Sequence, residues 1–176
     1  MSLLNPSTWW RAFENRSNSA EDGWKTAAVW YGLNRISGNV GTLNCDLIRQ
    51  QGENREKVKT GISNYLLNRR PSPIYGPFTF KQVMTFHALW FGAGRAYIHR
   101  DGRASELIIL DPSNTTTGIV DGEVWNATYI QRDQDKPANR LPLFKRMEQN
   151  PENVIMIPDR DCFRVTGFGD GINGVP

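Results

Sequence analysis

Apolar residues in the first half of the chain recur at the spacing of a helix. Residues 24–43 place them at alternating steps of four and three, which predicts a helix with one apolar face. These residues are Val29, Leu33, Ile36, Val40 and Leu43. Gly32, Gly38 and Gly41 each cost a free helix about 1 kcal/mol relative to alanine. They therefore indicate that another backbone packs closely on this helix.

A second long helix is predicted over residues 77–91, with Gly92 ending it. Its apolar stripe is expected to comprise Phe80, Val83, Met84, His87 and Trp90 or Phe91. A shorter helix is expected after Ser63, taken as its N-cap, and ends before Pro71 because proline disfavours helical geometry in the residue that precedes it.

The N-terminal residues 1–23 are interpreted as an arm. Within it, Ser7 or Thr8 caps a short predicted helix, and the motif "SNSAEDG" ends it. The apolar side chains of this helix are Trp9, Trp10 and Phe13. Either the core of the same chain or a neighbouring subunit covers them, because tryptophan is enriched in interface cores. A membrane-surface helix is a weaker third reading, because the cluster is short and carries few cations.

The remaining pattern alternates in the manner of strands separated by tight turns. Hairpins are predicted over residues 45–60, 95–110 and 115–132, the last two turning at Asp101-Gly102 and Asp121-Gly122. Two further strands follow a loop over residues 133–142, namely "NVIMI" and "DCFRVTGFG". Helices come first and antiparallel strands after, so the fold class is α+β, with two main helices packed on short antiparallel strands.

Composition fits a folded domain with ordinary surface chemistry. The chain has 176 residues, of which 39% are hydrophobic and 11% aromatic, values that argue against disorder. No apolar run approaches the roughly 20 residues of a membrane helix. The net charge of +3 permits contact with a polyanion, but the basic residues are scattered. They include Arg69, Arg70, Arg95, Arg100, Arg103, Lys145 and Arg146.

The end of the chain spells a nucleotide-binding motif that lacks its context. Gly169, Gly171 and Gly174 form G-x-G-x-x-G after a predicted strand. A dinucleotide site also needs a helix directly after the glycines and an acidic residue about 20 positions later. The sequence has no residues for either after Pro176. We therefore expect a tight-turning loop and no bound cofactor.

Candidate catalytic and metal-binding groups are few. His87 lies on a predicted core stripe and His99 on the solvent face of a strand. Cys45 and Cys162 lie far apart, outside any zinc-binding spacing, and are expected to be reduced, buried thiols. The carboxylates of Asp101, Glu106, Asp111 and Asp121 lie near turns or strand ends, where Asp bonds its own backbone. The sequence therefore predicts no catalytic, cofactor-binding or metal site, and no enzyme.

Four segments, taken in order, resemble the N-terminal half of portal proteins of long-tailed bacteriophages. They are residues 28–50, 62–102, 106–117 and 163–176. The features that carry the resemblance are the helix entering "ISGNVGTL", the step Arg70-Pro71-Ser72-Pro73, the strand Gly94-Arg95-Ala96-Tyr97-Ile98, and the final loop Gly167 to Pro176. No single motif is specific, whereas their order and spacing are.

The resemblance implies a mechanical function. Portal proteins form a ring, usually dodecameric, at one vertex of the virion capsid, where double-stranded DNA passes during packaging and ejection. Their partners are the major capsid protein, the terminase large subunit and head-tail adaptor proteins, with assembly in the host cytoplasm. The resemblance further implies an arm (1–23), a wing-like domain (24–166) and a glycine-rich connection (167–176) toward a stem helix, with stem, clip and crown missing from this chain. The alternative is a stand-alone α+β interaction or nucleic-acid-binding module.

Overall fold

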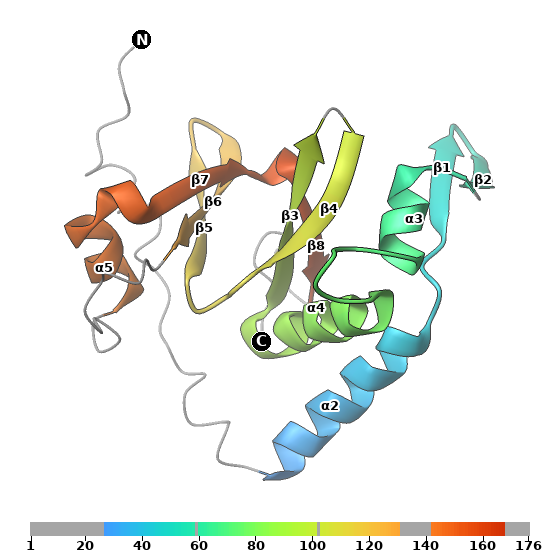
Figure 1. Cartoon of the computed structure of the whole chain (residues 1–176), viewed down its shortest axis with the longest axis horizontal. Coiled ribbons are helices and arrows are strands. Elements are labelled where there is room, and N and C mark those ends of the chain that lie inside the picture. The colour runs from blue at the N-terminus through green and yellow to red at the C-terminus, as the bar shows by residue number, and fades with distance from the viewer. Residues whose placement is uncertain (1–26, 59, 102, 131–141, 168–176) are drawn as a thin grey trace.

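The computed structural model describes residues 27–58, 60–101, 103–130 and 142–167. The helices of this part are α2 (Ala27–Thr42), α3 (Ile62–Asn68), α4 (Pro77–Phe91) and α5 (Leu143–Gln149). The strands are β1 (Leu47–Gln51), β2 (Asn54–Val58), β3 (Ala93–Asp101), β4 (Arg103–Leu110), β5 (Thr115–Val120), β6 (Glu123–Tyr129), β7 (Val154–Pro158) and β8 (Cys162–Thr166). The predicted α+β class is confirmed (Figure 1).

The described strands form three antiparallel sheets. Their orders are β1-β2, β4-β3-β8 and β5-β6-β7. The third sheet lies between β4 and β8 in the sequence, so the chain leaves the β4-β3-β8 sheet, builds β5-β6-β7 and then returns to pair β8 with β3. A short 3-10 turn, Asp159–Asp161, joins β7 to β8. We call β4-β3-β8 the central sheet and β5-β6-β7 the side sheet.

The main core lies between α4 and one face of the central sheet. Phe80 and Met84 of α4 pack with Ala96 of β3 and Leu107 of β4, and all four are at most 3% exposed. Gly94 of β3 lies directly beneath α4, where a Cβ atom would come 2.3 Å from the carbonyl oxygen of Met84. The helix therefore rests on the backbone of the sheet, which only glycine allows at this position.

Helix α2 packs on the outer side of α4 and projects below the molecule (Figure 1). The Trp30 ring meets the Phe86 ring edge-on at 5.3 Å, and a Cβ at Gly41 would lie 3.0 Å from the Phe78 ring. Gly41 thus confirms the expected close packing, whereas Gly32 has no such neighbour. The apolar stripe predicted for this helix does not face α4, because Val29, Ile36 and Leu43 are 42%, 51% and 60% exposed.

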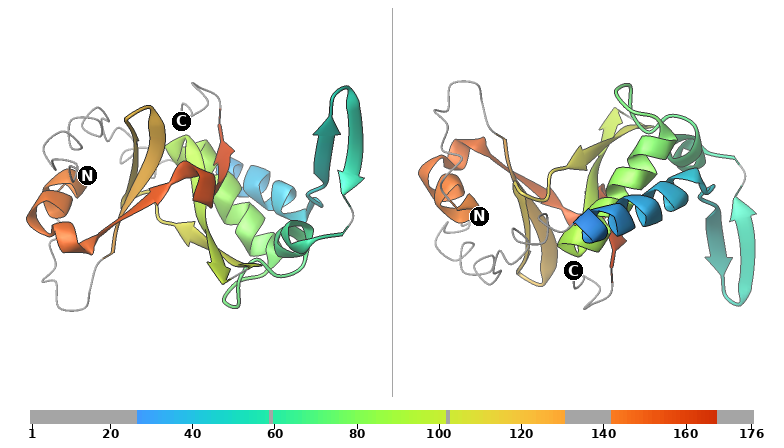
Figure 2. Two further views of the ribbon diagram at one scale, coloured as in Figure 1. Left: turned by 90° about the horizontal axis from the view of Figure 1, so that it is seen from above. Right: turned by 90° about the horizontal axis from the view of Figure 1, so that it is seen from below.

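The side sheet has its own small core with α5. Met147 of α5 is fully buried against Ala127 and Tyr129 of β6, and the Arg146 guanidinium lies over the Tyr129 ring. The sequence analysis did not predict α5. The sequence pattern that indicates this helix is the pair Leu143 and Met147, which lie one helical turn apart. Figure 2 shows α5 at one end of the molecule and the β1-β2 hairpin at the other.

Most predicted turns and ends are confirmed. Asp121 and Gly122 both have positive φ, 52° and 81°, as the turn between β5 and β6 requires, and Gly92 ends α4 in the left-handed conformation. The predicted cap of α3 is wrong, because Gly61 is the N-cap and Ser63 lies inside the helix. The arm helix, the loop at 133–141 and the terminal glycines lie outside the described residues.

Candidate functional site

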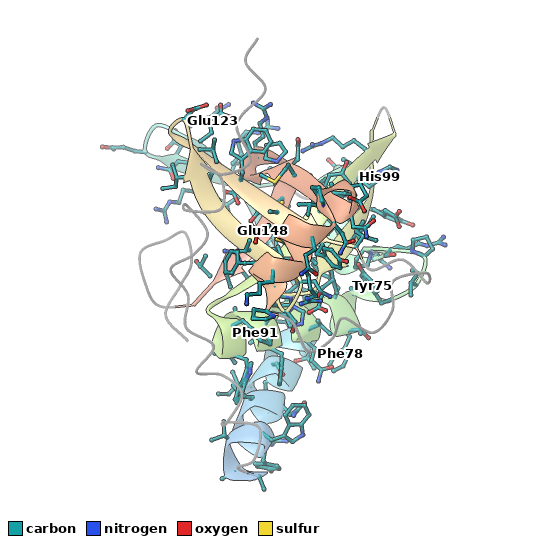
Figure 3. All side chains as sticks on the ribbon, turned by 90° about the vertical axis from the view of Figure 1, so that its left-hand side faces the viewer. Tyr75, Phe78, Phe91, His99, Glu123 and Glu148 are labelled. Carbon is teal, nitrogen blue, oxygen red and sulfur yellow. The ribbon has the colours of Figure 1, made fainter. Side chains whose placement is uncertain are left out.

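The two histidines do not form a shared site. His87 is half-buried in α4, and burial lowers its pKa from the usual 6.5, with Asp111 opposing the shift. His99 is exposed on β3, as predicted, and lies apart from Phe78 and Phe91 of α4 (Figure 3). Among the described residues, no group of His, Cys, Asp and Glu is arranged to hold a metal ion.

The carboxylates near turns and strand ends stabilise the backbone or neighbouring side chains. Asp111 accepts hydrogen bonds from the Ser113 backbone N–H at 2.9 Å and from the Asn114 side-chain amide at 2.9 Å. Glu106 accepts a hydrogen bond from Ser72 Oγ at 3.3 Å. The predicted role of a turn aspartate that binds nearby backbone is therefore confirmed at Asp111, whereas Glu106 lies inside β4 and binds a distant side chain.

Two of the features that carry the family resemblance, the step Arg70–Pro73 and the strand Gly94–Ile98, meet at the central sheet. Ser72, in the step Arg70–Pro73, is buried against β4, and the Pro71 carbonyl accepts a hydrogen bond from Leu107 N at 2.7 Å. The Tyr75 hydroxyl accepts a hydrogen bond from Ile109 N at 3.0 Å and donates one to the Leu107 carbonyl. Burial raises the pKa of Tyr75, which favours its neutral, donating form. The step thus fixes α3 and α4 relative to β4.

A polar cluster joins the central sheet to the side sheet. Fully buried Asn126 of β6 accepts a hydrogen bond from Thr117 Oγ1 at 2.9 Å and donates to Asp159 and to the Cys162 sulfur. Burial raises the pKa of Cys162 to about 11. Cys45 and Cys162 are both free and half-buried, rather than fully buried as predicted. The cluster holds the two sheets together and keeps Cys162 as an unreactive thiol.

The β1-β2 hairpin projects from the molecule and is anchored by two asparagines of α3. The side-chain amide of Asn68 binds both backbone groups of Cys45, accepting from its N–H at 2.9 Å and donating to its carbonyl at 2.8 Å. Asn64 donates to the Val58 carbonyl at 3.2 Å and accepts from Asn68 at 2.7 Å. We call Asn64 and Asn68 the asparagine clamp. Sequence analysis missed it, although asparagines one helical turn apart were visible.

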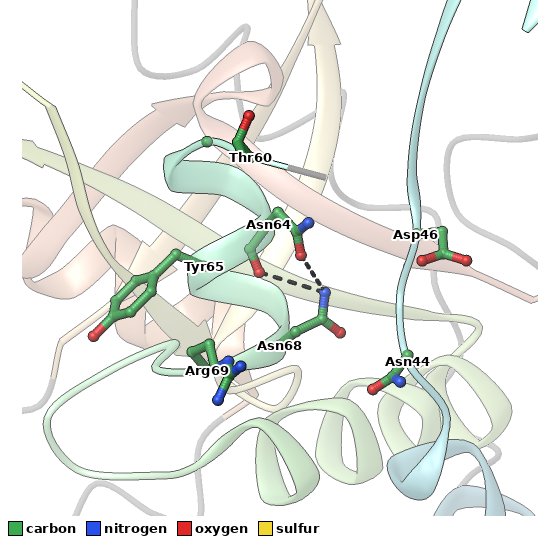
Figure 4. Close-up of a pocket in the computed structure, with 8 residues that line it drawn as sticks. Asn44, Asp46, Thr60, Asn64, Tyr65, Asn68 and Arg69 are labelled. Atoms are coloured by element: carbon green, nitrogen blue, oxygen red, sulfur yellow. Dashed lines mark hydrogen bonds between the residues drawn. The ribbon is translucent and has the colours of Figure 1, made fainter. Parts of the chain in front are cut away.

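Beside the clamp lies a polar hollow of about 670 Å³. It is bounded by α3 on one wall and by the strand leading into the hairpin on the other (Figure 4). Asp46 and Arg69 contribute opposite charges to its lining, but Asp46 already forms an ion pair with Lys57 at 2.6 Å. The hollow is a polar surface depression without a catalytic arrangement.

A second depression, of about 320 Å³, is apolar and lies between the two larger sheets. Tyr97, Ile108 and Leu110 line it from the central sheet, on the face opposite α4, and Ile155 and Met156 line it from β7. Ile108 and Ile155 are 40% and 47% exposed. This groove and the uncovered side of α2 are surfaces suited to contact with other polypeptide.

The basic side chains are dispersed, as the sequence indicated. Arg69 and Arg70 are exposed beside α3, whereas Arg95 is buried on β3. Arg100 pairs with Asp161, and Arg146 donates to Asn114 at 3.1 Å. These residues therefore lie on different elements, and Arg100 and Arg146 are engaged by neighbouring side chains. No helix in the described part is long and apolar enough to cross a membrane.

Comparison with solved structures finds the same fold in phage-like particles. One match is a chain in the virion of a native gene transfer agent (GTA) particle, with a TM-score of 0.56, 12% identity, and coverage of 87% of this chain and 36% of that chain. Another is a chain in the neck of an empty GTA particle described with C6 symmetry, with a TM-score of 0.54, 12% identity and coverage of 86% and 36%. This chain therefore spans little more than a third of the chains it matches.

Comparison with sequences gives a more specific result. A search of curated protein sequences found no match. A family model described as phage portal protein matches residues 27–175, which include every helix and strand described above. Members of that family are structural proteins and not enzymes. Because the match spans most of the sequence and agrees with the fold, this chain belongs to the phage portal protein family.

Proposed function

We propose that this chain is the wing-like part of a portal subunit that assembles into a ring. The observation that carries the proposal is the family match over residues 27–175, on a fold shared with chains of GTA particles. In this proposal residues 1–23 form an arm, residues 24–166 the wing-like domain and residues 167–176 a connection toward a stem helix. The stem, clip and crown would be supplied by polypeptide that this sequence does not contain.

The proposed ring would be dodecameric and would lie at the portal vertex of a virion. It would pass double-stranded DNA during packaging and ejection, and contact the terminase large subunit, the major capsid protein and head-tail adaptors. Each subunit of a closed ring needs two different contact surfaces, since the interface joins unlike patches of identical chains. The apolar groove beside β7 would be one of these surfaces, since Ile155 at its edge is 47% exposed.

Native mass spectrometry of the purified chain tests this proposal. The expected result is a closed assembly whose mass is a multiple of the subunit mass, which is 20.0 kDa for this sequence. A monomer at all concentrations would count against ring assembly by this chain. If that monomer also bound DNA with an affinity that fell steeply with salt, the chain would be a stand-alone nucleic-acid-binding module.

A further inference from the structure

Helix α2 carries an apolar seam that the rest of the described chain covers only in part, because Leu33 and Val40 are half-buried whereas Val29, Ile36 and Leu43 are exposed. The seam comprises Val29, Leu33, Ile36, Val40 and Leu43. Successive residues of an α-helix are about 100° apart, so the seam lies about 100° round the helix from the residues that face α4. Those α4-facing residues include Trp30 and Gly41, which contact Phe86 and Phe78.

The spacing of the seam is compatible with a helix as its partner. Alternating steps of three and four residues are the pattern of two helices that pack side by side. A sheet can cover a stripe of the same spacing, as the central sheet covers Phe80 and Met84 of α4, so the occupant is identified by what lies near the seam in the sequence. The seam contains no charged residue, so its partner must present an apolar stripe of its own.

The N-terminal arm provides such a stripe close to the seam in the sequence. Trp9, Trp10 and Phe13 fall within about 100° of one another on a helix, and we call them the tryptophan cluster. The arm ends at Gly23, four residues before α2 begins at Ala27 and six before the seam starts at Val29. A short connection keeps the local concentration of the cluster near the seam high. We propose that the tryptophan cluster packs on the α2 seam of the same chain, as the first half of a helical hairpin.

The dimensions agree with this arrangement. Helix α2 has 16 residues and is about 24 Å long, whereas a helix over residues 7–15 would be about 13 Å long. The arm would therefore cover the Val29–Ile36 half of the seam and leave Leu43 free. The connection "RSNSAEDG" supplies the small and polar residues that a reversal of the chain requires. This inference does not depend on ring assembly.

Limited trypsin digestion tests the contact, because Arg11 and Arg16 lie within or next to the tryptophan cluster. We expect both sites to be protected in the wild-type chain and cleaved at least about tenfold faster in Ile36→Asp, since that variant places a charge in the seam. Tyr31→Asp is the matched control, because Tyr31 is 70% exposed and lies about 140° round α2 from Ile36. Rapid cleavage of the wild-type chain, or equal rates in both variants, would overturn the proposal.

Disulfide trapping distinguishes a contact within one chain from a contact between copies. In a background with Cys45 and Cys162 replaced by serine, Phe13→Cys combined with Val29→Cys is expected to oxidise to a cross-linked monomer, because Phe13 lies near the connection and therefore opposite the start of the seam. Phe13→Cys combined with Tyr31→Cys should not. Cross-linked dimers would show instead that a second copy covers the seam. Absence of any cross-link would indicate that polypeptide outside this sequence covers the seam. Cross-linked dimers and the absence of a cross-link would each reject packing within the chain.

Discussion

The layered body around α4 and the projecting β1-β2 hairpin are held in place by different forces. In the body, Phe80, Met84 and Ala96 are almost completely buried, and α4 touches the backbone of β3 at Gly94. In the hairpin, every residue of β1 and β2 except the end pair Leu47 and Val58 is exposed. A two-stranded hairpin has little stability of its own, so its position depends on the asparagine clamp.

The difference indicates which part gives stability and which part is available for contact. Burial of apolar side chains dominates the folding free energy. The body buries such side chains between α4 and the central sheet, whereas the hairpin buries almost none. The hairpin instead carries charged pairs across its strands, such as Arg49 opposite Glu56. Charged side chains on an exposed strand also discourage unwanted pairing with other strands.

The largest expected effect comes from emptying the core of the body. Phe80→Ala removes a ring that is fully buried between α4 and the central sheet. We expect the free energy of unfolding to fall by about 3–5 kcal/mol. Ile48→Ala on the hairpin, where Ile48 is 60% exposed, should change it by less than about 0.5 kcal/mol. Urea denaturation of both variants measures the two changes in the free energy of unfolding. Similar decreases in the two variants would contradict the expected difference between body and hairpin.

Next in size is the contact between α4 and the backbone of β3. Gly94→Ala forces a shift of the Met84 carbonyl, and we expect a loss of about 2–4 kcal/mol. Gly32→Ala is the matched control, because a Cβ there meets nothing within 4 Å. In that half-buried helical position, where the space around the Cβ is open, alanine should stabilise the protein by up to about 1 kcal/mol. Thermal unfolding should move in opposite directions for the two variants.

A smaller and local effect is expected at the asparagine clamp. Asn68→Ala removes the hydrogen bonds to both backbone groups of Cys45, each worth about 1 kcal/mol. Amide hydrogen exchange over residues 47–58 should accelerate, while exchange in α4 stays unchanged. Asn39→Ala, on the exposed side of α2, is the control. Equal acceleration in α4 would mean that the hairpin and the body unfold as one unit.

The smallest effect concerns pH. Burial lowers the pKa of His87 in the folded chain, so the unfolded chain, with a pKa near 6.5, binds the proton more readily. The free energy of unfolding therefore has its full value above about pH 6.5 and decreases as the pH falls below that value. We expect His87→Gln to reduce this decline between about pH 7.5 and 5.5, measured as the shift in urea midpoint. An unchanged pH dependence would assign the decline to other groups.

The sequence predicted the helices and strands better than it predicted which of them pack against one another. Turn residues such as Asp121-Gly122 located the hairpins because few residues adopt positive φ. The apolar spacing of α2 located the helix, but spacing alone does not identify which of two apolar stripes faces the core. Trp30 and Gly41 face α4, whereas Ile36 does not. The asparagine clamp was missed because two asparagines one helical turn apart do not indicate which distant backbone groups their amides bind.

The insertion of the side sheet between β4 and β8 has a consequence for folding during synthesis. β3, β4 and α4 are neighbours in sequence, so their contacts can form as soon as residues 77–110 have emerged from the ribosome. β8 pairs with β3 only after residues 111–161 have folded back and brought Cys162 opposite Tyr97. Closing so long a segment is slow relative to local hairpin formation. Until then one edge of β3 stays open, and this interval is when the nascent chain is most exposed to pairing with the wrong strand.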